Sequence, residues 1–89
     1  MKLKRHRLFI KDFRSLILAD SQFDKLIYFL ALLRDGKSLP EESKDHALLG
    51  EWSDFREFHL GGDMLVIYKI RDDEVVLTRI GTHSQLFRS

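Results

Sequence analysis

The chain of 89 residues has no cysteine, a single proline and no long apolar run. Without cysteine it forms no disulfide framework, no thiolate nucleophile and no cysteine-based zinc finger, and this fits a reducing compartment. The longest apolar run, Leu26 to Leu33, is far shorter than the roughly 20 residues that a membrane span needs. The sequence therefore predicts one small domain over residues 1–89, cytoplasmic and without membrane contact.

The sequence also has no large excess of positive or negative residues, because the net charge is only +1. The distribution is uneven, however, since the first 14 residues carry six lysines and arginines against the single acid Asp12. Such a basic face fits either a polyanionic partner, nucleic acid or an acidic protein, or a solvated surface. Lys11 and Arg14 in this segment are candidate RNA contacts.

Hydrophobic periodicity predicts two helices in the first half of the chain. Residues 1–6 form a possible edge strand, and apolar residues then recur at helical spacing over 7–19. Ser21 is the expected N-cap of a second helix, which ends at Gly36 as the C′ residue. The two helices are expected to form a hairpin on one face of a sheet.

Three strands are predicted in the second half, over residues 54–60, 64–70 and 74–80. In the first strand, two sets of residues alternate, and either set could face the core. Gly61-Gly62 predicts a tight turn between the first strand and the second. The predicted fold is α+β: a two-helix hairpin packed on an antiparallel sheet in the order β-α-α-β-β-β, with a short C-terminal turn or helix that Thr82 caps. Trp52 and Tyr68 are expected in the core.

Polar groups at the ends of these strands are the candidates for chemistry: His46, His59, Asp63 and His83, with Arg79 and Glu57 as supports. A metal centre is one reading, since histidine and aspartate bind zinc, but no two histidines have the spacing of a helical zinc motif. The other is metal-free acid–base catalysis, because histidine titrates nearest neutral pH. A third possibility is that these histidines are structural. No metal or cofactor is expected.

Cleavage of RNA would suit these residue types. The reaction needs a base for the 2′-OH proton, an acid for the 5′-oxygen and a cation for the phosphorane, and its product is a 2′,3′-cyclic phosphate. Arg79 offers donors to phosphate oxygens. Asp63 poses a difficulty, because a strict two-residue turn at Gly61-Gly62 sends it and His59 to opposite faces of the sheet. The two share a site only if Asp63 belongs to a wider loop.

Several motifs together resemble the YafQ branch of the RelE/ParE toxin superfamily, over nearly the whole chain. They are Lys44-Asp45-His46-x-Leu48-x-Gly50-x-Trp52, Arg56-x-x-His59-x-x-x-Asp63, Ile67-Tyr68-Lys69 and Arg79-x-Gly81-Thr82-His83-x-x-Leu86-Phe87. The resemblance implies a RelE-like fold and a type II toxin: an endoribonuclease that cleaves mRNA, in the ribosomal A site, until an antitoxin neutralises it.

By the same resemblance, His46, His59, Asp63 and His83 match catalytic positions, Arg79 a phosphate-binding arginine and Phe87 a C-terminal aromatic. His59 and His83 would transfer protons, with Asp63 and His46 as base or orienting groups. Glu57 stands where close relatives have aspartate, which leaves its role open. Phe87 would either stack on a base of the RNA or hold the C-terminal segment against the sheet.

The implied partners are mRNA, ribosome-bound in this reading, and an acidic antitoxin that binds an otherwise monomeric toxin in a hetero-oligomer. The alternative is a superfamily member that is no nuclease, either a ParE-like gyrase inhibitor or an inactive binding module.

Overall fold

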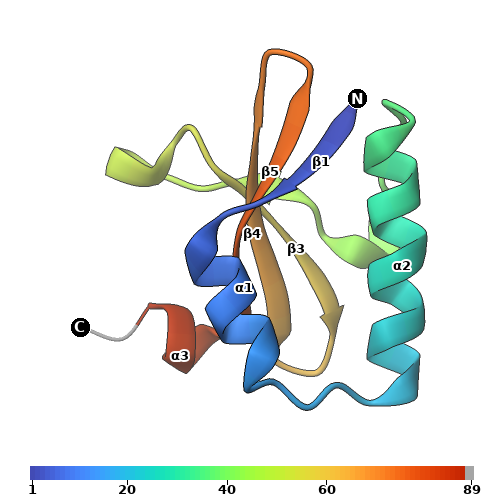
Figure 1. The fold of residues 1–89 in the computed structure, drawn as a ribbon, viewed down its shortest axis with the longest axis vertical. Coiled ribbons are helices and arrows are strands. Elements are labelled where there is room, and N and C mark those ends of the chain that lie inside the picture. The colour runs from blue at the N-terminus through green and yellow to red at the C-terminus, as the bar shows by residue number, and fades with distance from the viewer. Residues whose placement is uncertain (88–89) are drawn as a thin grey trace.

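A five-stranded sheet forms the centre of the structure, a computed structural model that describes residues 1–87 (Figure 1). The strands lie in the order β1-β5-β4-β3-β2, and their bounds are β1 (Lys2–Arg5), β2 (His46–Ala47), β3 (Arg56–Gly61), β4 (Met64–Arg71) and β5 (Glu74–Thr82). Strands β3 to β5 form the expected antiparallel meander, and β2, which the predicted order did not include, extends it antiparallel to β3. β1 instead runs parallel to β5, because no hairpin joins the two and β1 pairs with the edge that the meander leaves free. The sheet is therefore mixed rather than wholly antiparallel.

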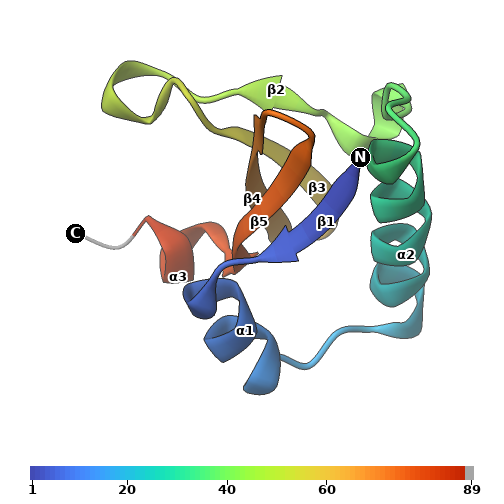
Figure 2. The ribbon, with the colours of Figure 1, turned by 45° about the horizontal axis from the view of Figure 1, so that its top comes forward.

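The helices confirm the α+β class, and the order of the elements is the predicted one apart from the added strand β2. They are α1 (Arg7–Arg14), α2 (Asp20–Arg34) and α3 (His83–Leu86), with 3₁₀ turns η1 (Glu41–Ser43) and η2 (Gly50–Trp52) in the long connection after α2. α1 packs on β5 and α2 on β3 and β1. The two helices contribute to one core but are set apart, joined by an extended segment (Figure 2). None of the helices in residues 1–87 is long and apolar enough to cross a membrane.

The first helix is shorter than the predicted range of 7–19. His6 caps its start, since the Nδ1 atom accepts a hydrogen bond from the Leu8 amide at 3.1 Å. The helix ends at Arg14, and the Ser15 amide closes the last turn on the carbonyl of Asp12. Ile17, which the periodicity placed on the buried face, is 91% exposed. Helical spacing alone did not say which apolar residues would reach the sheet.

The second helix begins before the predicted cap at Ser21. Ala19 is the N-cap, and its amide donates to Oε1 of Gln22 at 3.0 Å. The Nε2 atom of the same Gln22 donates to the carbonyl of Gly61 at 3.1 Å, so the cap also tethers the β3–β4 turn. At the other end Gly36 has a φ of +71°, which confirms it as the C′ residue.

The core lies between α1, α2 and one face of the sheet. Phe29 of α2 meets Phe58 of β3 edge-on at 5.6 Å between ring centroids, and Phe58 meets Tyr68 of β4 at the same distance. Tyr68 is 1% exposed, as predicted. Trp52 is not in the core, because the η2 turn carries it outward and leaves it 47% exposed against Phe55.

Candidate active site

Strand alternation places the candidate residues on the face of the sheet opposite the core. Phe58 and Leu60 of β3 point to α2 and are buried in the core, so Glu57 and His59 point to the other face. This decides between the two inner faces that the sequence left open. The same face receives His46 from β2, whose partner across the ladder is Glu57, and His83 from the first position of α3.

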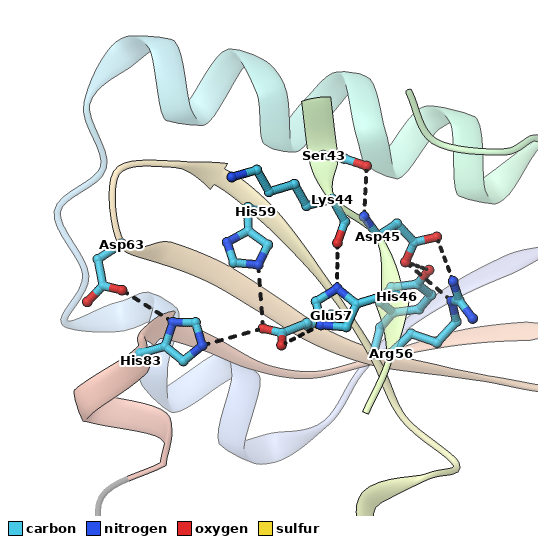
Figure 3. A network of polar contacts seen from close by, with 10 residues as sticks. Ser43, Lys44, Asp45, His46, Arg56, Glu57, His59, Asp63 and His83 are labelled. Atoms are coloured by element: carbon cyan, nitrogen blue, oxygen red, sulfur yellow. Dashed lines mark hydrogen bonds and ion pairs between the residues drawn. The ribbon is translucent and has the colours of Figure 1, made fainter. Parts of the chain in front are cut away.

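The carboxylate of Glu57 is the centre of the site (Figure 3). Its Oε1 atom lies 3.0 Å from Nε2 of His46, while its Oε2 atom lies 3.8 Å from Nε2 of His59 and 4.0 Å from Nε2 of His83. Glu57 is only 5% exposed, and Oε2 is buried with no hydrogen-bond partner. A buried carboxylate oxygen without a donor is costly, and the three imidazoles around it are placed to offset its charge only when they are protonated.

His46 is held by the short segment before it. Lys44 has a left-handed φ of +52°, and its carbonyl oxygen lies 2.6 Å from Nδ1 of His46. A carbonyl only accepts, so Nδ1 carries a proton and Nε2 is the atom directed at Glu57. Backbone geometry therefore fixes which nitrogen of His46 serves the site.

Asp45 anchors this segment to the sheet, a feature that the sequence analysis missed. The Tyr68 hydroxyl donates to Oδ1 of Asp45 at 2.6 Å, and Nε and Nη2 of Arg56 donate to its two oxygens at 3.3 Å each. Burial and this bond raise the pKa of Tyr68 well above its ordinary value, and the bond to Asp45 raises the pKa of Arg56. The Lys-Asp-His motif was a signal that Asp45 is more than a loop residue.

Asp63 reaches the site because the turn is not where the sequence placed it. A bulge between His59 and Gly61 pairs Gly61 with Met64, so the loop residues are Gly62 and Asp63. Oδ1 of Asp63 then lies 3.3 Å from Nδ1 of His83. The predicted condition was a wider loop; the structure instead shifts the two-residue turn by one position, which takes Asp63 out of the strand.

His59 is the most enclosed of the three imidazoles, with 22% of its side chain exposed. Burial lowers the pKa of His59, the Glu57 carboxylate opposes this effect, and the positive charges of neighbours including Lys44 add to it. The Lys44 side chain extends over His59 (Figure 3), which makes it a cation near the site that the sequence analysis did not single out.

Phe87 completes a row of rings on this face. The ring centroids are 6.2 Å apart for His46 and His59, 5.9 Å for His59 and His83, and 5.6 Å for His83 and Phe87. Phe87 is 42% exposed, so it packs on His83 and still presents surface to solvent. Both readings of its role are compatible with this position.

The remaining candidates are basic residues that lie on α1 or are paired with it. Arg79 forms an ion pair with Asp12 of α1, through Nε at 2.7 Å and Nη2 at 3.0 Å, and this raises the pKa of Arg79. Asp12 also accepts from the amide of Ile80, on the part of β5 beyond its β1 partners. Lys11 and Arg14 are exposed on α1, and Arg14 lines a separate groove.

The arrangement supports two kinds of chemistry. His46, Glu57 and His59 each present a ligand atom within 4.8 Å of the others, so small side-chain movements would bring all three to one metal ion. The same groups, with His83, form a chain of proton donors and acceptors beside a cleft of about 460 Å³ that Leu48, Leu49 and Phe87 also line. Such a chain is suited to general acid–base catalysis.

Comparisons with known proteins identify one family of bacterial proteins as relatives of this chain. The family model described as "Bacterial toxin of type II toxin-antitoxin system, YafQ" matches residues 1–88. The mRNA interferase toxin YafQ of Escherichia coli K12 is 40% identical over 65 residues, 72% of this chain and 71% of that protein.

Solved structures have the same fold. YafQ in an E. coli DinJ–YafQ complex superposes with a TM-score of 0.81 at 32% identity, over 97% of each chain. A metal-bound toxin from Helicobacter pylori superposes with a TM-score of 0.84 at 33% identity, over 97% of this chain and 98% of the other. The match of the family model to nearly the whole sequence decides the classification: the chain belongs to the YafQ family of bacterial toxins of type II toxin–antitoxin systems.

Proposed function

We propose that this toxin is an endoribonuclease that cleaves mRNA by attack of a 2′-OH on the adjacent phosphate, leaving a 2′,3′-cyclic phosphate. The observation that carries the proposal is the convergence of three imidazoles on the buried carboxylate of Glu57. The relative in E. coli that shares 40% identity is named an mRNA interferase, which supports the same activity here. DNA lacks the 2′-OH and is not a substrate of this reaction.

His59 and His83 are the proposed proton-transfer groups. His83 is half exposed at the open side of the site, and Asp63 orients it through Nδ1, which leaves Nε2 directed inward. A carboxylate in this position favours the imidazolium that forms during proton transfer. Glu57 offsets the positive charge of whichever imidazole is protonated, and His46 is held on its other oxygen.

Two cations are candidates for the phosphorane charge. Arg79 is engaged by Asp12 through Nε and Nη2, yet about a third of its side chain is exposed. Lys44 extends over His59 and is exposed (Figure 3). Phe87 is the proposed stacking platform for a base beside the cleaved phosphate, since its ring extends the row that begins at His46.

The proposed substrate is mRNA in the ribosomal A site. With a net charge of +1, ribosome binding rests on local basic surface, which the exposed Lys11 and Arg14 of α1 provide. Cleavage by these groups requires no metal ion.

The proposed protein partner is a cognate acidic antitoxin. The neighbouring E. coli structure supports this, because YafQ is in complex with DinJ there. An apolar groove of about 530 Å³ lies between α1, α2 and β1, and Phe13 and Phe23 line it. We propose that an amphipathic segment of the antitoxin binds there, with its acidic side chains facing Arg5 and Arg14 at the groove. We also propose that the toxin is a monomer when the antitoxin is absent. Phe23→Asp should abolish rescue of cell growth by the antitoxin; rescue that persists would place the antitoxin elsewhere.

The deciding experiment is cleavage of a defined mRNA in excess EDTA, with and without translating ribosomes, by wild type and His83→Ala. We expect wild type alone to cleave, with cyclic-phosphate ends, and ribosome dependence to identify the substrate. His83→Ala should remain folded, because His83 is half exposed. If the folded wild type cleaves no RNA in any condition, the nuclease proposal is wrong, and a gyrase supercoiling assay would then test the ParE-like alternative.

A further inference from the structure

We infer that His46, Glu57 and His59 form a binding site for one transition-metal ion of the zinc class, and that an ion held there switches off RNA cleavage. The regulatory half of this inference rests on the function proposed above, whereas the binding half needs only the geometry of the three side chains.

The three side chains lie close enough together to share one metal ion after small side-chain movements. Nε2 of His46 is 3.0 Å from Oε1 of Glu57, and Nε2 of His59 is 3.8 Å from Oε2. Two ligand atoms that are each about 2.1 Å from a tetrahedral ion are roughly 3.4 Å apart, so the observed separations bracket the required one. Two imidazoles and one carboxylate are an established zinc ligand set that leaves a fourth position open.

The hydrogen bonding of His46 leaves its inner nitrogen available to a cation. Its Nδ1 atom donates to the carbonyl of Lys44 at 2.6 Å, so in the neutral ring the lone pair is on Nε2. That lone pair faces the carboxylate of Glu57, which also only accepts. The contact is favourable either when His46 is an imidazolium or when a cation lies between the two acceptors. The bond to Lys44 is also the outer-shell contact that metal-binding histidines make.

Glu57 supplies an independent observation. Its Oε2 atom is buried without a hydrogen-bond partner, and the side chain is 6% exposed. A buried carboxylate oxygen that nothing satisfies is compensated when a cation coordinates it. Half of the His46 side chain is exposed, which gives an ion a path from solvent.

Occupation of the site would stop the proposed reaction for a chemical reason. A bound ion takes the lone pairs of His46 and His59 and neutralises the charge of Glu57, the groups that the reaction uses to move and offset protons. Metal and catalysis therefore compete for the same atoms. The toxin would be active without the ion and reversibly inhibited with it.

Isothermal titration of the purified full chain with Zn²⁺ alone tests the binding half. We expect one ion per chain, and at least about tenfold weaker binding for His46→Gln and for His59→Gln. His6→Gln removes a histidine at the start of α1, and His83→Gln removes one outside the ligand set; both should bind Zn²⁺ as wild type does. Circular dichroism without metal checks that each variant is folded. No binding by wild type, or equal loss in His83→Gln, would overturn the ligand set.

Cleavage assays test the regulatory half. Zn²⁺ should suppress cleavage by wild type and by His6→Gln over the range in which it binds, and EDTA should restore it. Binding that leaves cleavage unchanged would overturn inhibition. Cleavage by a protein that binds no Zn²⁺ would overturn the metal site and leave the nuclease proposal intact. Binding by a protein that never cleaves RNA would instead leave the metal site and remove the nuclease proposal.

Discussion

Removing the hydroxyl of Tyr68 should weaken both the fold and the active site, because that hydroxyl anchors the segment that presents His46. Tyr68 donates to Asp45 at 2.6 Å, and the ring lies in the core. Tyr68→Phe keeps the ring and deletes only the bond. A hydrogen bond to a charged group contributes about 1.5–3 kcal/mol, and Arg56 still satisfies Asp45 in the variant, so we expect the lower end, about 1.5 kcal/mol.

Urea denaturation followed by circular dichroism measures this loss. For a domain of this length it corresponds to a fall of roughly 6–12 °C in Tm. Tyr28→Phe is the matched control, since Tyr28 is exposed on α2 and should change stability by less than about 0.5 kcal/mol. Equal stability of Tyr68→Phe and wild type would refute the bond to Asp45.

RNA cleavage measures the second consequence. His46 follows Asp45 directly, and a displacement of about 1 Å in a catalytic group can cost roughly 100-fold in rate. Tyr68→Phe should therefore lower kcat more than its stability loss explains at a temperature where it is fully folded. A double-mutant cycle with Asp45→Asn should give a coupling energy of about 0.5–3 kcal/mol. Full activity in a destabilised Tyr68→Phe would show that Asp45 supports the fold but not His46.

Three further predictions concern stability. The pKa of Tyr68 is raised on folding, so the native state keeps the proton that the unfolded state loses near pH 10; the stability advantage of wild type over Tyr68→Phe should shrink above about pH 10 in urea melts. Leu26→Ala should cost about 2–5 kcal/mol, whereas Ile27→Ala, half exposed on the next position of α2, should cost far less. Gly61→Ala should cost about 1–3 kcal/mol, because φ is +105° there although a Cβ would have space; Gly62→Asn, at a φ of +59°, should cost less. Equal losses within either pair would refute these assignments.

The sequence predicted the elements better than their ends. Richness in Val, Ile and Leu located β4 and β5. The apolar run of β4 is continuous because its first five residues are buried on both faces of the sheet. The predicted end of the first helix was wrong, because Leu16 and Ile17 continue the helical spacing beyond Arg14. Only the position of α2 shows that the chain must leave the sheet at this point. Trp52 was expected in the core, but the η2 turn carries it outward, where it packs against Phe55 and is 47% exposed.

The candidate site was predictable as a set of residues and less so as a geometry. The family resemblance singled out the histidines, and the structure brings three of them to Glu57. Alternation alone indicated that Glu57 and His59 share a face, but not that Glu57 would be buried. Burial depends on β2, a strand of only two residues that pairs His46 with Glu57 across the ladder. So short a strand has no periodicity from which its pairing could be predicted.

Asp63 shows how a local backbone choice decides the composition of a site. Pairing in strict alternation would send Asp63 and His59 to opposite faces. The bulge removes this conflict by adding one residue to β3, and Gly61 accommodates it with a φ of +105°, which other residues rarely adopt. Gln22 of α2 then holds the Gly61 carbonyl, so the second helix stabilises the turn that directs Asp63 to His83. The glycine pair that marked a turn in the sequence is therefore also what completes the active site.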